Sequence, residues 1–178
     1  MKSLLVFLLS LVLAPVHAAV VSFNPPNSTV GFGATFIVDV NGAGFATELD
    51  GGGLNLSFDP TILQLKSVKL DTTEWNFSSD PGTISNLLGT VTGTQFNQFG
   101  KAKIGSFAIL GYEFQAIGPG TSALTLTEFG LNPFASGGDV VPTIFSPGSV
   151  TVMPEPAAGW MLLAGIGVVA FGIARRRG

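Results

Sequence analysis

The sequence predicts an all-β protein, a single antiparallel β-sandwich preceded by a signal peptide and followed by a membrane-spanning helix. Three observations carry the prediction of a sandwich. Apolar and polar residues alternate in several short runs, which is typical of half-buried strands. Clusters of glycine and proline separate these runs. No ten-residue window between the two ends carries the apolar stripe of an amphipathic helix.

Residues 1–18 have the three parts of a secretory signal peptide. Lys2 supplies a positive charge, residues 4–14 are leucine-rich and apolar, and Val16-His17-Ala18 resembles an A-x-A cleavage site. We therefore expect signal peptidase to cut after Ala18. A cut after Ala19 is the alternative, and an uncleaved N-terminal anchor fits less well because the apolar stretch is short.

Residues 154–178 have the composition of a membrane anchor. Pro154-Glu155-Pro156 precedes an uncharged run at residues 157–174, and Arg175-Arg176-Arg177 follows it. A helix over residues 157–174 would be roughly 27 Å long, slightly less than the hydrocarbon core of about 30 Å. Clustered arginines stay on the cytoplasmic side, so the preceding domain is expected outside. An ordinary C-terminal anchor is one explanation.

The order of these three parts also resembles the PEP-CTERM sorting signal, over residues 153–178. The resemblance implies that a membrane-embedded exosortase recognises Pro154, Glu155 and Pro156 and cuts near them. Arg175, Arg176 and Arg177 would complete the signal, and none of these residues would be catalytic. It also implies transient anchoring in the inner membrane of a Gram-negative bacterium, followed by transfer to the cell surface or an extracellular matrix containing exopolysaccharide.

Residues 19–153 lie between the two signals and are long enough for one domain with a full core. Their only cations are Lys66, Lys69, Lys101 and Lys103, against ten acidic residues. Nucleic acid is therefore not expected as a partner, because its binding needs several basic contacts. The only histidine is His17, inside the signal peptide, and the chain has no cysteine. We expect no catalytic residue and no transition-metal site in the domain.

Alternation predicts the strands and the direction of their side chains. Phe36, Val38 and Val40 are expected to face the core, with Thr35 and Asp39 outside. Similar patterns occur at residues 54–58, 108–116, 124–127 and 150–152, and the third of them places Ala108, Leu110 and Tyr112 inside. The expected turns are Asn24-Pro25-Pro26, Gly51-Gly52-Gly53, Asp80-Pro81-Gly82, Gly118-Pro119-Gly120 and Ser146-Pro147-Gly148.

A second resemblance covers residues 20–152. Val30-Gly31 precedes the run at residues 36–40, and Phe58-Asp59-Pro60 precedes Leu63 and Val68. Later, Phe114-Gln115-Ala116 is followed by Gly118-Pro119-Gly120 and Leu124-Thr125-Leu126. This order resembles the cohesins and implies a cohesin-like jelly roll, related in architecture to carbohydrate-binding modules. A cohesin is a noncatalytic module that binds a dockerin, and a single anchored module of this kind is expected to be a general interaction or adhesion module.

Three further kinds of site were considered in the domain. Asp39, Asn41, Glu48 and Asp50 offer oxygen ligands for calcium, although their spacing departs from an EF-hand loop. Two carboxylate pairs, Glu113 with Glu128 and Asp71 with Glu74, have the residue types of a glycosidase, but solvated carboxylates are the simpler explanation. Asn27, Asn55 and Asn76 begin N-x-[ST] sequons, which a bacterial protein is not expected to glycosylate in the eukaryotic way.

Sugar binding is the main alternative to a protein-interaction role. Aromatic rings stack on sugars, and the domain has only Trp75 and Tyr112 besides its phenylalanines. Tyr112 is expected inside, whereas Trp75 lies in a polar stretch and is the expected exposed ring. Asn76, with Gln95, Asn97 and Gln98, is expected to add hydrogen bonds. The predicted function is therefore an exported interaction or adhesion module, with a carbohydrate-binding module second and a glycoside hydrolase third.

Overall fold

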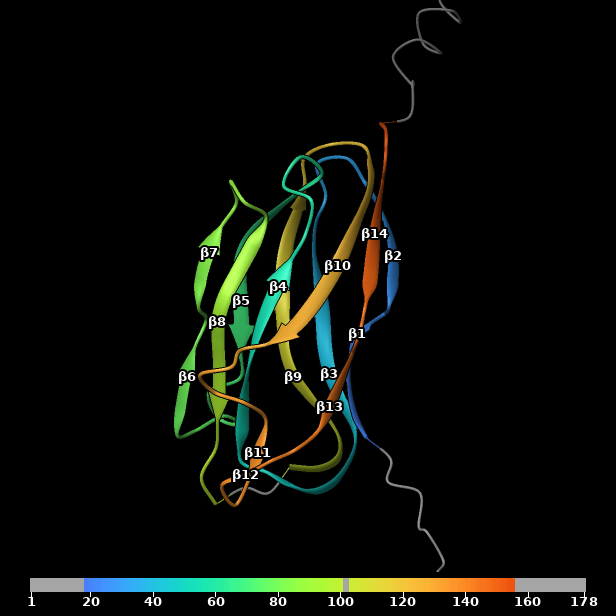
Figure 1. The fold of residues 1–178 in the computed structure, drawn as a ribbon. Coiled ribbons are helices and arrows are strands. Elements are labelled where there is room, and N and C mark those ends of the chain that lie inside the picture. Colours follow the sequence, from blue (N-terminus) through green and yellow to red (C-terminus); the bar gives the residue numbers. More distant parts are fainter. Residues whose placement is uncertain (1–17, 101–102, 156–178) are drawn as a thin grey trace, which may run out of the picture.

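The computed structural model describes residues 18–100 and 103–155, which fold into two facing β-sheets (Figure 1). These residues contain no helix, so the predicted all-β fold is confirmed. The strands are β1 (Ala19–Asn24), β2 (Asn27–Gly31), β3 (Thr35–Leu49), β4 (Gly51–Ser57), β5 (Leu63–Leu70), β6 (Ser78–Asp80), β7 (Thr83–Ser85), β8 (Thr90–Asn97), β9 (Lys103–Ala116), β10 (Gly120–Glu128), β11 (Ala135–Ser136), β12 (Asp139–Val140), β13 (Thr143–Ser146) and β14 (Gly148–Met153).

The two sheets differ in size and connectivity. The first has five strands in the order β13-β1-β3-β9-β5, and the second follows the order β12-β11-β4-β10-β14-β2. β8 joins the second sheet beside β4 and in turn pairs with β6 and β7. Apolar side chains from both sheets fill the space between them, as in a jelly roll.

Two strand pairs correct the expectation of a wholly antiparallel sandwich. β1 runs parallel to β13, and β14 runs parallel to β2. The turn at Asn24-Pro25-Pro26 is the physical reason, because it passes the chain from β1 in the first sheet to β2 in the second. The last two strands of the chain, β13 and β14, therefore pair with its first two, β1 and β2.

Most predicted inward residues do face the core. Val38, Leu54, Tyr112, Leu126 and Val150 are all at most 3% exposed. Ala108 is an exception, because it is exposed rather than buried. In the pairing of β3 with β9, Val40 faces Leu110 but Asn41 faces Ala108, so Ile109 is an extra residue in β9. This β-bulge reverses the phase of the strand and buries both Ile109 and Leu110.

The triple glycine at residues 51–53 was expected to form a turn, but it begins strand β4 and is buried. Its lack of side chains lets neighbouring groups approach the strand closely. A Cβ atom on Gly52 would lie 2.9 Å from the ring of Phe134, and one on Gly51 would lie 2.5 Å from the carbonyl oxygen of Phe96. Glycine therefore serves close packing here, which is its other common use in a strand.

The described chain begins and ends at opposite ends of the sandwich (Figure 1). β1 starts at Ala19, and β14 ends at Met153, directly before the tripeptide. The expected signal peptide, except Ala18, and the expected membrane-spanning run at 157–174 lie outside the described residues. Within residues 18–100 and 103–155, no helix is long and apolar enough to cross a membrane.

Candidate binding surface

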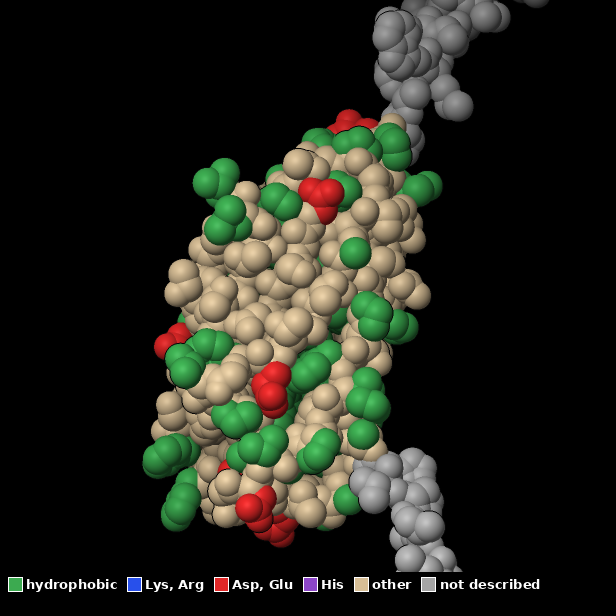
Figure 2. Space-filling view, in the orientation of Figure 1, with side chains coloured by type: hydrophobic (Ala, Val, Ile, Leu, Met, Phe, Trp, Pro, Cys, Tyr) green, Lys and Arg blue, Asp and Glu red, His purple; other side chains and the backbone are tan. Residues whose placement is uncertain are grey.

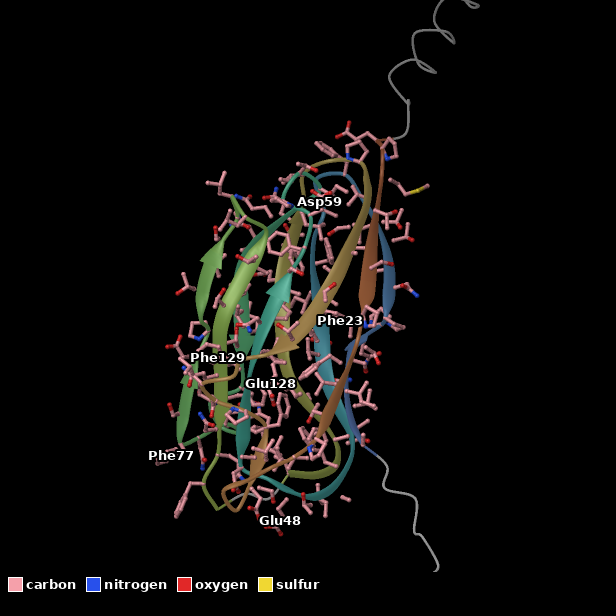
Figure 3. All side chains as sticks on the ribbon, viewed as in Figure 1. Phe23, Glu48, Asp59, Phe77, Glu128 and Phe129 are labelled. Atoms are coloured by element: carbon pink, nitrogen blue, oxygen red, sulfur yellow. The ribbon has the colours of Figure 1, made fainter. Side chains whose placement is uncertain are left out.

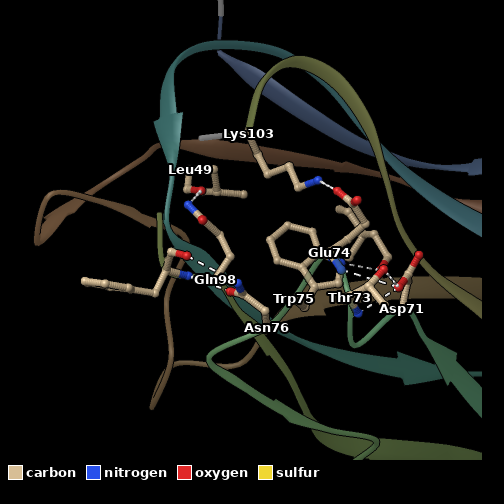
Figure 4. A network of polar contacts seen from close by, with 10 residues as sticks. Leu49, Asp71, Thr73, Glu74, Trp75, Asn76, Gln98 and Lys103 are labelled. Atoms are coloured by element: carbon tan, nitrogen blue, oxygen red, sulfur yellow. Dashed lines mark hydrogen bonds and ion pairs between the residues drawn. The ribbon is translucent and has the colours of Figure 1, made fainter. Parts of the chain in front are cut away.

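The loop at residues 71–77, between β5 and β6, turns its tryptophan into the core (Figure 4). The Asp71 carboxylate accepts hydrogen bonds from the backbone N–H of Thr73 at 2.9 Å and from its hydroxyl at 2.6 Å. These bonds form a tight turn of the kind that aspartate stabilises. Trp75 then points inward, only 1% exposed, and its indole N–H donates to the carbonyl of Ile109.

The expectation that Trp75 is exposed is therefore wrong. Its ring packs against Phe96 and Phe107, with centroid distances of 4.9 and 6.1 Å. The Lys103 ammonium lies 5.6 Å from the ring centroid and also pairs with the Glu74 carboxylate. The polar residues of the loop thus cover the buried ring, and Trp75 cannot stack on a sugar without local unfolding.

Two other aromatic rings are exposed nearby, Phe77 at the end of this loop and Phe99 in the segment after β8. Phe77 is 72% exposed and Phe99 is 78% exposed, and their ring centroids lie 6.3 Å apart. The side chain of Asn76 fixes the Phe99 backbone, because its carboxamide oxygen accepts from the Phe99 N–H at 2.9 Å and its nitrogen donates to the Phe99 carbonyl at 3.3 Å. No signal in the sequence distinguishes this pair, because phenylalanine is usually buried.

A hollow of about 420 Å³ lies beside the two rings. It is lined by Asp50, Phe77, Asn97, Gln98, Phe99 and Gly100. Of the amides expected to add hydrogen bonds, Asn97 and Gln98 line the hollow, whereas Asn76 is not part of its lining and bonds the Phe99 backbone. Gln98 donates to the Leu49 carbonyl at 3.0 Å, and Asn97 donates to the Ser78 carbonyl at 3.3 Å. Gln95 lies two residues before Asn97 on β8, outside the lining.

The first carboxylate pair does not converge on one cleft. Glu113 lies on β9 in the first sheet, and Glu128 ends β10 in the second. Glu113 accepts from the Ser67 hydroxyl at 2.6 Å and lies 3.1 Å from the Lys69 ammonium. The hydrogen bond from Ser67, and then that from Lys69, lower the pKa of Glu113. Glu128 accepts from the Phe134 N–H at 3.0 Å.

The second pair, Asp71 and Glu74, lines a shallow hollow of about 370 Å³ over β3, β9 and β5. Asp71 holds the turn of its own loop, and Glu74 pairs with Lys103. Both carboxylates therefore have structural partners in the loop and across it.

The calcium candidates are spread over the fold. Asp39 faces Gly111 in the middle of the first sheet. Asp50 lies between β3 and β4, and its carboxylate accepts from the Gly137 N–H at 2.6 Å. Among the residues that the structure describes, no group of three or more His, Cys, Asp or Glu side chains could hold a metal ion.

The three sequon asparagines all take part in the hydrogen bonding of the fold. Asn27 accepts from the Ser149 hydroxyl at 2.8 Å, and Asn55 accepts from the Gly93 N–H at 2.9 Å. Asn76 holds Phe99, as described above.

Comparisons with known proteins agree with this architecture and with the tail. The family model of the PEP-CTERM protein-sorting motif matches residues 154–177. No curated protein sequence matches the chain. The structure is similar to the cohesin CaCohA2 from Clostridium acetobutylicum, with a TM-score of 0.61, 18% identity, and coverage of 76% of this chain and 91% of that one.

Two other cohesins show similar agreement. A cohesin in a type I cohesin–dockerin complex from Clostridium thermocellum has a TM-score of 0.65 and 10% identity, covering 77% of this chain and all of that one. A non-cellulosomal cohesin from the archaeon Archaeoglobus fulgidus has a TM-score of 0.63 and 14% identity, covering 82% and 98%. The chain therefore carries a PEP-CTERM motif and has a cohesin-like fold, as predicted.

Proposed function

We propose that this protein is an exosortase substrate whose cohesin-like domain is a noncatalytic interaction module on the surface or in the extracellular matrix of a Gram-negative bacterium. In this proposal, residues 1–18 direct export and are removed after Ala18, residues 19–153 form the module, and residues 154–178 are the sorting tail. The observation that carries the proposal is the sorting motif at residues 154–177, which begins directly after β14 ends at Met153.

The interaction role rests on the fold and on the carboxylates. One of the similar cohesins is known in a complex with a dockerin. In this chain the carboxylates that resemble a glycosidase pair are engaged in turns, ion pairs and strand contacts. A binding role accounts both for the cohesin-like fold and for carboxylates that are engaged in structural contacts. The partner proposed for the module is an envelope protein.

The sorting role can be tested by replacing Pro154-Glu155-Pro156 with three alanines. The wild-type protein is expected at the cell surface or in the medium without its terminal arginines, because exosortase would remove them. The variant is expected in the membrane fraction with Arg175, Arg176 and Arg177 still present. Glu48→Ala, which removes an exposed carboxylate far from the tail, is the matched control and should behave as wild type. Identical localisation of the triple variant and the wild type would refute the proposal.

Carbohydrate binding is the second candidate, because Phe77 and Phe99 form an exposed aromatic pair beside the Asn97 and Gln98 side chains. Because Trp75 is buried, it does not supply the sugar-stacking ring that the sequence predicted. The phenylalanine pair supplies another stacking surface. Affinity electrophoresis in purified exopolysaccharide can test it. The double variant Phe77→Ala/Phe99→Ala should lose its retardation, whereas Leu131→Ala, which removes an equally exposed apolar side chain, should keep it. Equal retardation of the two variants would remove the aromatic pair from any sugar site.

A further inference from the structure

The end of the sandwich from which residues 154–155 leave carries exposed apolar side chains in each of several loops. We call it the tail end, and its apolar residues are Phe32, Leu87, Leu88, Ile117 and Met153, which are 40% to 88% exposed. Figure 2 shows hydrophobic side chains around the point where the chain leaves the fold. In Figure 3, Asp59 marks the tail end, whereas Phe77 and Glu48 mark the opposite end.

Backbone hydrogen bonds hold three of these residues in one unit. The Phe32 N–H donates to the Met153 carbonyl at 3.0 Å, and the next residue, Gly33, donates to the Ala116 carbonyl at 2.9 Å. Ile117 follows directly and donates to the Ile62 carbonyl at 2.8 Å. Hydrogen bonds between their segments thus fix Phe32, Ile117 and Met153 around the exit point of the chain.

The distance between this unit and the expected membrane span is short. Only Pro154-Glu155-Pro156 separates Met153 from the apolar run that starts at Ala157. Four residue steps cover at most roughly 14 Å when fully extended. The headgroup layer on one side of a bilayer takes up roughly 5 to 8 Å of that length. The run at residues 157–174 is slightly shorter than the hydrocarbon core, so all of its residues are needed to span the core and none can lengthen the linker.

We propose that the tail end rests on the outer surface of the membrane while the tail is in place, with Phe32, Ile117 and Met153 in the headgroup region. This inference rests on the proposed function, since it requires the tail to span the bilayer. The contact is apolar rather than ionic, because the charged residues in the loops of this end, Asp59 and Glu155, are both acidic. It holds the tripeptide at the membrane surface, where a membrane-embedded protease can reach it.

The absence of cysteine allows single labels to test this directly. The full chain, with its tail intact, is reconstituted in phosphatidylcholine vesicles containing a headgroup nitroxide lipid. A fluorophore is attached to Phe32→Cys or Ile117→Cys at the tail end, or to Phe99→Cys or Leu131→Cys at exposed apolar positions elsewhere in the fold. We expect at least roughly twofold stronger quenching at the first two positions, because side chains at an interface reach headgroup depth.

Two further measurements make the outcome decisive. In the labelled Phe32→Cys protein, replacing Ile117 and Met153 with serine should reduce the quenching, since the contact depends on apolar side chains. A label at Ala164→Cys, inside the expected span, is measured in separate vesicles whose lipids carry the nitroxide on the acyl chain, and its quenching reports whether the tail enters the bilayer. If Ala164 is unquenched, the spanning tail of the proposed function fails. If the Ala164 label is quenched but the labels at positions 32 and 117 are quenched no more than those at positions 99 and 131, the tail spans the membrane and only the contact of the tail end is overturned.

Discussion

The indole N–H of Trp75 donates a 2.9 Å hydrogen bond to the carbonyl of Ile109, the extra residue in the bulge of β9. A bulge leaves one residue outside the regular ladder, and its carbonyl here receives a donor from the loop after β5. The bond therefore links the loop at residues 71–77 to the point where β9 changes phase. It also explains why a tryptophan in a polar stretch is buried, because a buried indole needs an acceptor.

Trp75→Ala is expected to destabilise the domain by about 3 to 5 kcal/mol, because it removes a buried ring and leaves the Ile109 carbonyl without its donor. Phe77→Ala, two residues later in the chain, is the control and should change the free energy of unfolding by less than about 1 kcal/mol, since Phe77 is largely exposed. Urea denaturation of both variants measures the difference. Similar midpoints for the two would contradict the buried position of Trp75.

Gly51→Ala is expected to cost about 1 to 3 kcal/mol, because the added Cβ would lie 2.5 Å from the Phe96 carbonyl oxygen and force strands β4 and β8 apart. Gly31→Ala is the matched control, since no atom lies within 4 Å of a Cβ there. Thermal unfolding of the two variants compares the sites. A Gly51→Ala variant as stable as Gly31→Ala would show that β4 does not pack as described.

Tyr112, the only tyrosine of the chain, should limit stability at high pH. Burial raises the pKa of its hydroxyl far above the ordinary value of about 10, because the charged form would lose its hydration. Because this pKa is higher in the folded than in the unfolded state, the neutral hydroxyl contributes fully to stability below the ordinary pKa. The contribution is lost as the pH rises above that value. The midpoint of thermal unfolding should therefore fall above about pH 10, and tyrosinate absorbance should appear only together with unfolding. Titration near the ordinary value in the folded protein would contradict this.

Tyr112→Phe should leave stability unchanged or raise it by up to about 1 kcal/mol, since the hydroxyl makes no hydrogen bond with any described residue. The neighbouring Thr94 hydroxyl, which acts against burial to lower the Tyr112 pKa, donates to the Pro81 carbonyl. The variant should also lose part of the dependence on high pH. Denaturation curves for wild type and variant at neutral and alkaline pH test both expectations, and a clear loss of stability at neutral pH would reveal a hydrogen bond to the hydroxyl.

The alternating runs predicted most inward positions, because a strand with one face on the core must repeat every two residues. Two bulges set the limit of this method. Ile109 shifts the phase of β9, so Ala108 turned outward. In β8, a register shift pairs Thr94 with Leu54 and Val91 with Leu56, so two buried residues stand three positions apart rather than two or four. The alternating runs therefore did not include this strand.

Side-chain environment limited the prediction of the binding surface. Local composition marked Trp75 as exposed, whereas contacts with Phe96, Phe107 and Ile109, all farther along the chain, bury it. Phenylalanine is usually buried, so no local signal separated Phe77 and Phe99 from the phenylalanines of the core. The Asn76 carboxamide bonds the backbone of Phe99, a contact between two loops that the sequence does not indicate.

The intact mass of the protein recovered from the cell surface or medium decides whether both ends are removed during export and sorting. We expect a chain that begins at Ala19 and ends near Pro154-Glu155-Pro156, because signal peptidase and exosortase would each remove one end. A surface population that retains the C-terminus through Arg177 would contradict it and leave an ordinary membrane anchor.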